Sequence, residues 1–316
     1  MPRHRSTATP NASVGLAVPR SFDAGYGTAV DRGLCLGGGG LFFVAWQTSY
    51  LQTLAGHGIR FDSSDRVVGT SAGSLVASAL VGGRLKRFHS EVSVLAKLPG
   101  LVSVLAPASE FRPSQQRALD LFLLATDAEP ATIQEIGRAA LAATTPRPEV
   151  TRRNMSLILG AGKMQSEALH ITCVDAYTGE RCVLTSAAGV ATARAVAASS
   201  AVPGVFAPQP IGDRRCMDGG VSGTGTHLDL FDGARRVLIL ALTDGNEVAE
   251  GMMTSQPEDG RKELEDLQGS GTEVLLRTPS EVDLLELMAP GSVPKALAMG
   301  ARQASADIGL LSTFWS

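Results

Sequence analysis

The sequence lacks the features that would attach it to nucleic acid or carry it through a membrane. Lys and Arg total 28 against 31 Asp and Glu, so the net charge is −3 and offers nucleic acid no electrostatic attraction. No apolar run is long enough to cross a bilayer, and the N-terminal residues lack the apolar stretch of a secretory signal. These absences predict a soluble, cytoplasmic protein that meets a membrane only at its surface.

Cysteine and histidine are also scarce. The four cysteines (Cys35, Cys173, Cys182 and Cys216) are widely spaced, contain no C-x-x-C pair and have apolar neighbours. They therefore predict buried strand thiols in a reducing compartment, and their spacing suggests neither a metal site nor a redox motif. The five histidines are His4, His57, His89, His170 and His227. No metal-ligand spacing or cofactor motif is present, so we expect neither a metal nor an organic cofactor.

What the chain does contain is the composition of a large globular α/β protein. Its 316 residues are 44% hydrophobic and include 35 glycines. Residues 1–30 are rich in Pro, Ser, Thr and Ala, which is typical of a flexible leader. The rest, 31–316, is expected to form a single domain.

The first ordered residues alternate between strand and helix patterns. An apolar run at Gly33–Leu36 ends in four glycines, and residues 41–56 then place apolar side chains at helical spacing. Asp65–Gly69 is the next strand pattern, and a helix of small residues follows Ser71. This order predicts a mostly parallel central sheet with helices on both faces.

Residues 84–165 have little strand character and predict a helical insertion. Its helices are expected at 84–98, 115–124, 132–143 and 152–159, separated by prolines. The apolar segment 95–107 is either a cover for an acyl pocket or an ordinary buried helix pair. Strands are expected again at 168–175, 181–186, 236–242 and 273–277, with later helices at 259–268 and 293–312.

A serine stands between the second strand pattern and the helix that follows it. Gly69, Thr70, Ser71, Ala72 and Gly73 have the G-x-S-x-G spacing of a nucleophile elbow. Such a turn lifts the hydroxyl clear of the sheet and places it at a helix N-terminus. The alternative is a helix-capping serine with no chemistry.

The four glycines after the first strand are a second candidate element. Gly37, Gly38, Gly39 and Gly40 leave backbone N–H groups accessible, as an oxyanion hole requires. No Lys follows as in a P-loop, and the dinucleotide fingerprint is also absent. The alternative is a tight turn that allows close packing of helix on sheet.

The third element is an aspartate followed by two glycines, Asp218-Gly219-Gly220. It is either an ordinary turn or a carboxylate presented at a strand end as a base. Asp175 and Asp213 fit turns or strand ends. His227 is the one histidine that follows Asp218, so a Ser-Asp-His triad in α/β-hydrolase order remains an alternative.

These blocks occur in a particular order. The glycine loop, GTSAG, ASSAVPGVF (198–206) and DGG together resemble the patatin-like phospholipase family, from about residue 33 to the C-terminal helix. The resemblance implies a three-layer α/β fold. It also implies a lipid acyl hydrolase of the phospholipase or esterase type, acting on lipid or acyl-ester substrates.

In that family a serine and an aspartate form a catalytic dyad without histidine. By position these are Ser71 as nucleophile and Asp218 as base, with the oxyanion bound by the N–H groups of the glycine loop, chiefly Gly38, Gly39 and Gly40. The resemblance implies no cofactor.

One departure from the family pattern lies in the glycine loop. The family commonly has a cation near its end, whereas this chain has Leu41 and Phe42. The change favours acyl chains or neutral esters over anionic head groups. A lipid-binding protein without activity and an acyltransferase on the same fold remain the alternatives.

Overall fold

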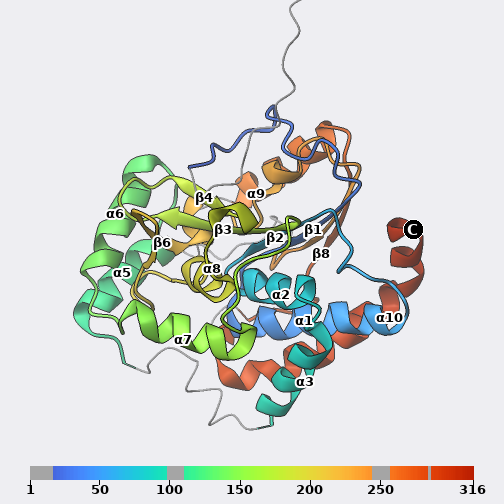
Figure 1. The fold of residues 1–316 in the computed structure, drawn as a ribbon, viewed down its shortest axis with the longest axis horizontal. Coiled ribbons are helices and arrows are strands. Elements are labelled where there is room, and N and C mark those ends of the chain that lie inside the picture. Colours follow the sequence, from blue (N-terminus) through green and yellow to red (C-terminus); the bar gives the residue numbers. More distant parts are fainter. Residues whose placement is uncertain (1–16, 98–109, 244–256, 284–285) are drawn as a thin grey trace, which may run out of the picture.

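A computed structural model describes residues 17–97, 110–243, 257–283 and 286–316 (Figure 1). Its centre is an eight-stranded mixed sheet with strand order β5-β6-β3-β2-β1-β7-β8, and β4 pairs with β3. The strands are β1 (Arg32–Leu36), β2 (Arg66–Thr70), β3 (Leu169–Asp175), β4 (Arg181–Leu184), β5 (Gln209–Ile211), β6 (Arg214–Asp218), β7 (Arg236–Leu240) and β8 (Glu273–Arg277). The five strands from β3 to β8 along this order are parallel, which confirms the predicted mostly parallel sheet.

Helices cover both faces of the sheet because its central strands are apolar on both sides. In β1, Leu34 and Leu36 join one core and Cys35 joins another. The first core includes α1 (Gly40–Gly56), α2 (Ala72–Val81), α8 (Thr192–Ser199) and α10 (Val293–Trp315); the second includes α9 (Pro257–Gly269). Figure 1 shows these layers above and below the sheet. The three-layer α/β arrangement is therefore confirmed.

The helical insertion is divided between two places: its first helix packs against α1 and α2, and its later helices lie at the β6 side of the sheet. Its helices are α3 (Leu85–Leu95), α5 (Pro113–Leu123), α6 (Pro130–Ala142) and α7 (Pro148–Leu159), close to the predicted ranges. Phe122 and Ile136 of this insertion pack against Val174 and Met217 of the sheet. Most of the apolar segment 95–107, predicted to be either a pocket cover or a buried helix pair, lies outside the described residues.

Two features differ from the sequence analysis. The short antiparallel strands β5 and β6 were not predicted, apart from the strand end proposed at Asp218, because β6 begins with two arginines and shows no apolar alternation. The leader was expected over residues 1–30, of which 1–16 lie outside the described residues. The remainder packs on the sheet: Val18, Tyr26 and Val30 are buried in the second core. The packed chain therefore begins earlier than the composition suggested.

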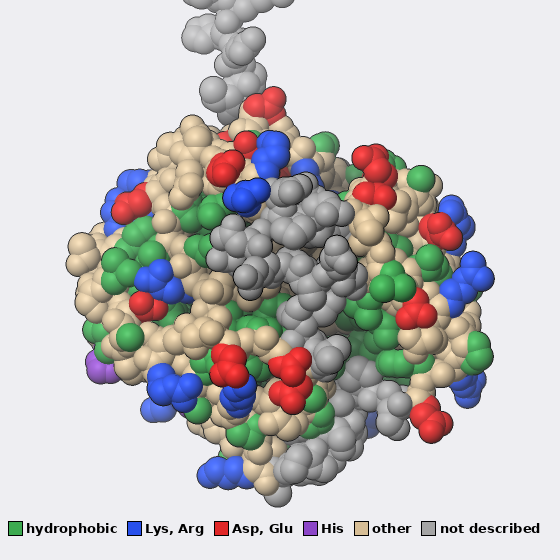
Figure 2. All heavy atoms as spheres, turned by 180° about the vertical axis from the view of Figure 1, so that it is seen from behind, with side chains coloured by type: hydrophobic (Ala, Val, Ile, Leu, Met, Phe, Trp, Pro, Cys, Tyr) green, Lys and Arg blue, Asp and Glu red, His purple; other side chains and the backbone are tan. Residues whose placement is uncertain are grey.

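The surface carries charges of both signs. On the face shown in Figure 2, acidic and basic side chains are interspersed among apolar ones.

Within the described ranges, no helix is long and apolar enough to cross a membrane. The same residues contain no group of three or more His, Cys, Asp or Glu that could hold a metal ion. All four cysteines are buried and unpaired, as predicted.

Candidate active site

Two strands meet end to end along one edge of β3, and each brings one candidate residue. Strand β2 runs parallel to β3 and ends with Thr70 opposite Thr172. Strand β6 runs antiparallel to β3 and ends with Asp218 opposite the next residue, Cys173. The opposite edge of β3 is occupied by β4 at Ile171–Val174. The carboxyl ends of β2 and β6 therefore face each other, and Ser71 and Asp218 meet there although they are far apart in the chain.

Close packing at this junction explains the small residues around it. A Cβ on Gly219 would lie 2.7 Å from Thr172 Oγ1 and 2.9 Å from Thr70 Cγ2. The hydroxyls of Thr70 and Thr172 are themselves hydrogen-bonded at 2.8 Å. A side chain after Asp218 would therefore push the two strand ends apart.

Ser71 occupies a strained turn between β2 and α2. Its φ of 50° and ψ of −118° lie in a region that residues other than glycine rarely adopt. Its carbonyl accepts the backbone N–H of Ser74 at 3.0 Å and the Ser74 hydroxyl at 2.6 Å. A Cβ on Gly73 would lie only 1.9 Å from Leu36 O, so α2 begins directly against the end of β1. The predicted elbow geometry is present, with the half-buried Ser71 at the N-terminus of α2.

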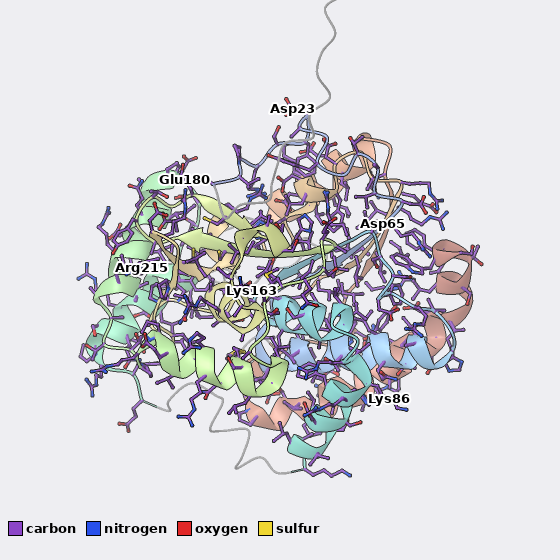
Figure 3. All side chains as sticks on the ribbon, viewed as in Figure 1. Asp23, Asp65, Lys86, Lys163, Glu180 and Arg215 are labelled. Carbon is purple, nitrogen blue, oxygen red and sulfur yellow. The ribbon has the colours of Figure 1, made fainter. Side chains whose placement is uncertain are left out.

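Asp218, at the end of β6, is shielded from water. It is 3% exposed, whereas acidic residues such as Asp23 and Glu180 project from the periphery of the fold (Figure 3). Its Oδ1 accepts the Gly220 N–H at 2.9 Å, and among the described residues its Oδ2 meets no partner at hydrogen-bond geometry. Burial raises the pKa of Asp218 to about 6, opposed by the Gly220 N–H and by the nearby Ser71 hydroxyl.

The glycine loop passes beside Ser71. A Cβ on Gly38 would lie 3.3 Å from Ser71 Cβ, so this residue of the loop is close to the serine side chain. Across the described ranges, no acceptor is found for the N–H groups of Gly38, Gly39 and Gly40. The Gly37 N–H is different, because it donates to Leu240 O at 3.0 Å and continues the pairing of β1 with β7.

Residues outside the motif hold this loop in place, and sequence reasoning missed them. The fully buried Gln47 of α1 donates its amide to Gly37 O at 3.1 Å. On the other side, the Phe42 N–H donates to Leu287 O at 3.0 Å, and a Cβ on Gly40 would lie 2.6 Å from the same oxygen. The one sequence feature that could have pointed to Gln47 is its polar amide side chain within a mostly apolar helix.

Leu41 and Phe42, the departure from the family pattern, form the first turn of α1 rather than part of the loop. Phe42 is 3% exposed and belongs to the core, and Leu41 packs against that core. The glycine loop therefore ends against an apolar surface.

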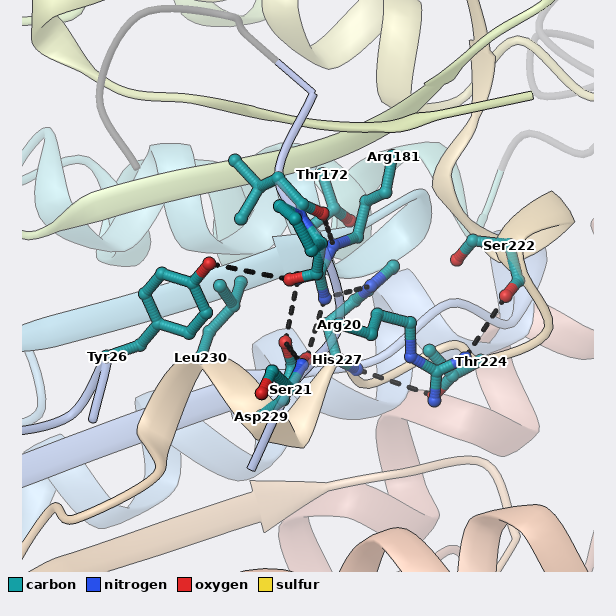
Figure 4. Close-up of polar contacts among 12 residues, drawn as sticks. Arg20, Ser21, Tyr26, Thr172, Arg181, Ser222, Thr224, His227, Asp229 and Leu230 are labelled. Carbon is teal, nitrogen blue, oxygen red and sulfur yellow. Dashed lines mark hydrogen bonds and ion pairs between the residues drawn. The ribbon is translucent and has the colours of Figure 1, made fainter. Parts of the chain in front are cut away.

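His227, the alternative base, is part of a different cluster. Its Nδ1 lies 3.4 Å from an Arg181 nitrogen, and Arg181 makes two hydrogen bonds of 2.6 and 2.7 Å to Asp229 (Figure 4). Burial, together with the positive charge of Arg181, holds the pKa of His227 well below its usual range. Arg181 also donates to Val18 O and Pro19 O, so the cluster fixes the N-terminal segment to the sheet.

Comparison with known protein families identifies the family to which this chain belongs. The sequence model of the family described as patatin-like phospholipase matches residues 34–228, more than half of the chain and both candidate residues. The chain belongs to the patatin-like phospholipase family. This assignment confirms the resemblance and supports lipid acyl hydrolysis at the level of the family.

Solved structures also match this chain, and one of them aligns over most of it. The crystal structure of the type III effector protein ExoU aligns at 18% identity and a TM-score of 0.31. The alignment covers 88% of this chain and 54% of that one, so this chain spans about half the length of ExoU. No match is found among curated proteins.

Proposed function

We propose that this protein hydrolyses acyl esters of lipids, with Ser71 as nucleophile and Asp218 as general base. One observation carries the proposal: the ends of β2 and β6 bring a strained, half-buried serine to a buried carboxylate whose Oδ2 has no other partner among the described residues. Catalytic hydrogen bonds are often loose without substrate and tighten when it binds.

The reaction would proceed through an acyl-enzyme. Ser71 Oγ attacks the ester carbonyl while Asp218 Oδ2 accepts the hydroxyl proton, and the carbonyl oxygen becomes an oxyanion. The N–H groups of Gly38, Gly39 and Gly40 are the donors available to bind it. The protonated Asp218 returns its proton to the leaving alcohol. Water, activated by the same carboxylate, then releases the fatty acid and restores Ser71.

The surroundings of the glycine loop favour an uncharged ester. Leu41 and Phe42 stand where the family commonly has a cation, and both pack with the core. We therefore propose acyl chains or neutral esters as the preferred substrates. Membrane contact would be weak and confined to the surface, since the sequence has no strongly basic amphipathic helix to bind anionic lipid.

Hydrolysis of p-nitrophenyl esters of short and long acyl chains tests the proposal. Wild type and His227→Asn should be active, and Ser71→Ala should lose activity by about 10³-fold or more, because no other side chain replaces the nucleophile. Asn is the substitution for His227 because it tolerates the left-handed backbone there, φ 54°. Loss of activity in a folded His227→Asn protein would favour the triad. Inactive wild type would favour a lipid-binding protein, and ester formation with an added alcohol would favour an acyltransferase.

The activity should depend on pH through Asp218. Because its pKa is raised to about 6 and the base acts in its ionised form, kcat/KM should rise with pH around 6 and level off above about 7. A pH–rate profile of the wild type measures this. A midpoint near 4, the ordinary value for Asp, would contradict a buried base.

A further inference from the structure

The last residue of α8 and the residues just after it hydrogen-bond to both candidate catalytic residues. Ser199, the last residue of α8, accepts the Ser71 N–H on its Oγ at 2.8 Å. Two residues later, Ala201 O accepts the Asp218 N–H at 3.0 Å. Ser199 and Ala201 are both fully buried.

This segment is itself rigidly bonded. The Ser200 N–H donates to Val196 O at 3.0 Å, and the Ala201 N–H donates to Ala198 O at 3.2 Å. The distance between the Ser199 hydroxyl and the Ala201 carbonyl is therefore set by the end of a helix. Neither contact involves the glycine loop or the reacting atoms.

We propose that Ser199 and Ala201 form a bracket that holds Ser71 and Asp218 at a fixed separation, with Ser199 as a positioning residue. The inference rests on the proposed dyad. The bracket is needed because the ends of β2 and β6 do not pair with each other: each pairs with β3. Besides β3, residues 199–201 are the segment of the described chain that hydrogen-bonds to both Ser71 and Asp218.

The Ser199 hydrogen bond also stabilises an unfavourable backbone conformation. Without Oγ, the Ser71 N–H would lose its partner, and the peptide at φ 50° would be free to relax. Relaxation would move Ser71 Oγ away from Asp218. A displacement of about 1 Å at a reacting group can reduce the rate by about a hundredfold.

Kinetics of Ser199→Ala, with Ser200→Ala as the matched control, test the bracket. Ser200 is the adjacent serine, and its hydroxyl makes no hydrogen bond within the described part of the chain. Ser199→Ala should lower kcat about ten- to a hundredfold with KM changed less than about twofold. Ser200→Ala should change neither, and Ser199→Thr, which keeps the hydroxyl, should recover much of the rate.

A double-mutant cycle separates positioning from general destabilisation. In an Asp218→Asn background, Ser199→Ala should lower the rate by less than about threefold. The base is already absent there, so the separation between Ser71 and residue 218 that Ser199 maintains no longer affects the rate. Effects that multiply across the two sites would overturn the proposal.

Amide hydrogen exchange supplies a readout independent of activity. Ser199→Ala should accelerate exchange at the Ser71 amide, and Ser200→Ala should not. If wild type proves inactive, the proposed function fails, and this exchange still decides whether the bracket exists. Unchanged Ser71 exchange in Ser199→Ala would reject it whatever the activity.

Discussion

Asp218→Asn should lower kcat by about 10²–10⁴-fold, the range that general-base catalysis contributes. The substitution removes the proton acceptor and keeps the shape, since an amide oxygen can still accept the Gly220 N–H at the position of Oδ1. Ester hydrolysis at pH 7.5 measures the loss. A reduction of less than about tenfold would mean that another group accepts the serine proton.

The same variant should be more stable than wild type at pH 7.5. Because the pKa of Asp218 is raised to about 6 in the folded protein, the folded state holds this proton more tightly than the unfolded state. Stability from this group is therefore present below about pH 4 and is lost as the pH rises through 6. An uncharged amide avoids that loss, so thermal unfolding at pH 7.5 should shift upward. An inactive but stabilised protein would exclude misfolding as the cause of inactivity.

Arg181→Met should reduce the free energy of unfolding by about 3–5 kcal/mol, the usual effect of removing one partner of a buried ion pair. Arg181 and Asp229 have side chains 3% and 0% exposed, so the substitution leaves an unpaired carboxylate in the core. It also removes the hydrogen bonds to Val18 O and Pro19 O. Urea unfolding measures the change.

Two further variants control this measurement. Arg87→Ala breaks an exposed ion pair with Glu91 on one helix and should cost less than about 0.5 kcal/mol. Arg181→Met combined with Asp229→Leu should be less destabilising than the two single changes added together, because no charge is then left buried. A loss below 1 kcal/mol in Arg181→Met would show that Asp229 finds another partner or water.

The parts of this fold that the sequence predicts are those set by local pattern. The apolar runs of β1, β2 and β3 and the periodicity of α1 gave their elements nearly to the residue. Ser71 and Asp218 were found because motifs mark sharp turns. Their roles and that of the glycine loop stay predictions until activity is measured.

What the sequence could not predict depends on pairing between distant segments. Strand β6 carries two arginines and was recognised only at its last residue. Its place beside β3 depends on the register in which two strands distant in the sequence pair. Ser199 looked like one small residue among many, because its partner lies across the fold. The packing of residues 17–30 was missed since their composition resembles a leader, whereas Arg181 and the second core hold them.

The end-to-end arrangement of β2 and β6 also bears on how the protein folds. Ser71 and Asp218 share no local segment, and the strands that carry them are joined within the sheet through β3. The chain between Ser71 and Asp218 must close into a long loop before these residues can meet. Closing it costs chain entropy before any contact forms, which makes such pairings slow. Ser71 and Asp218 would therefore come together late in folding, after β6 has joined the sheet. Under the proposed function, a newly synthesised chain would act on lipids only once its sheet is complete.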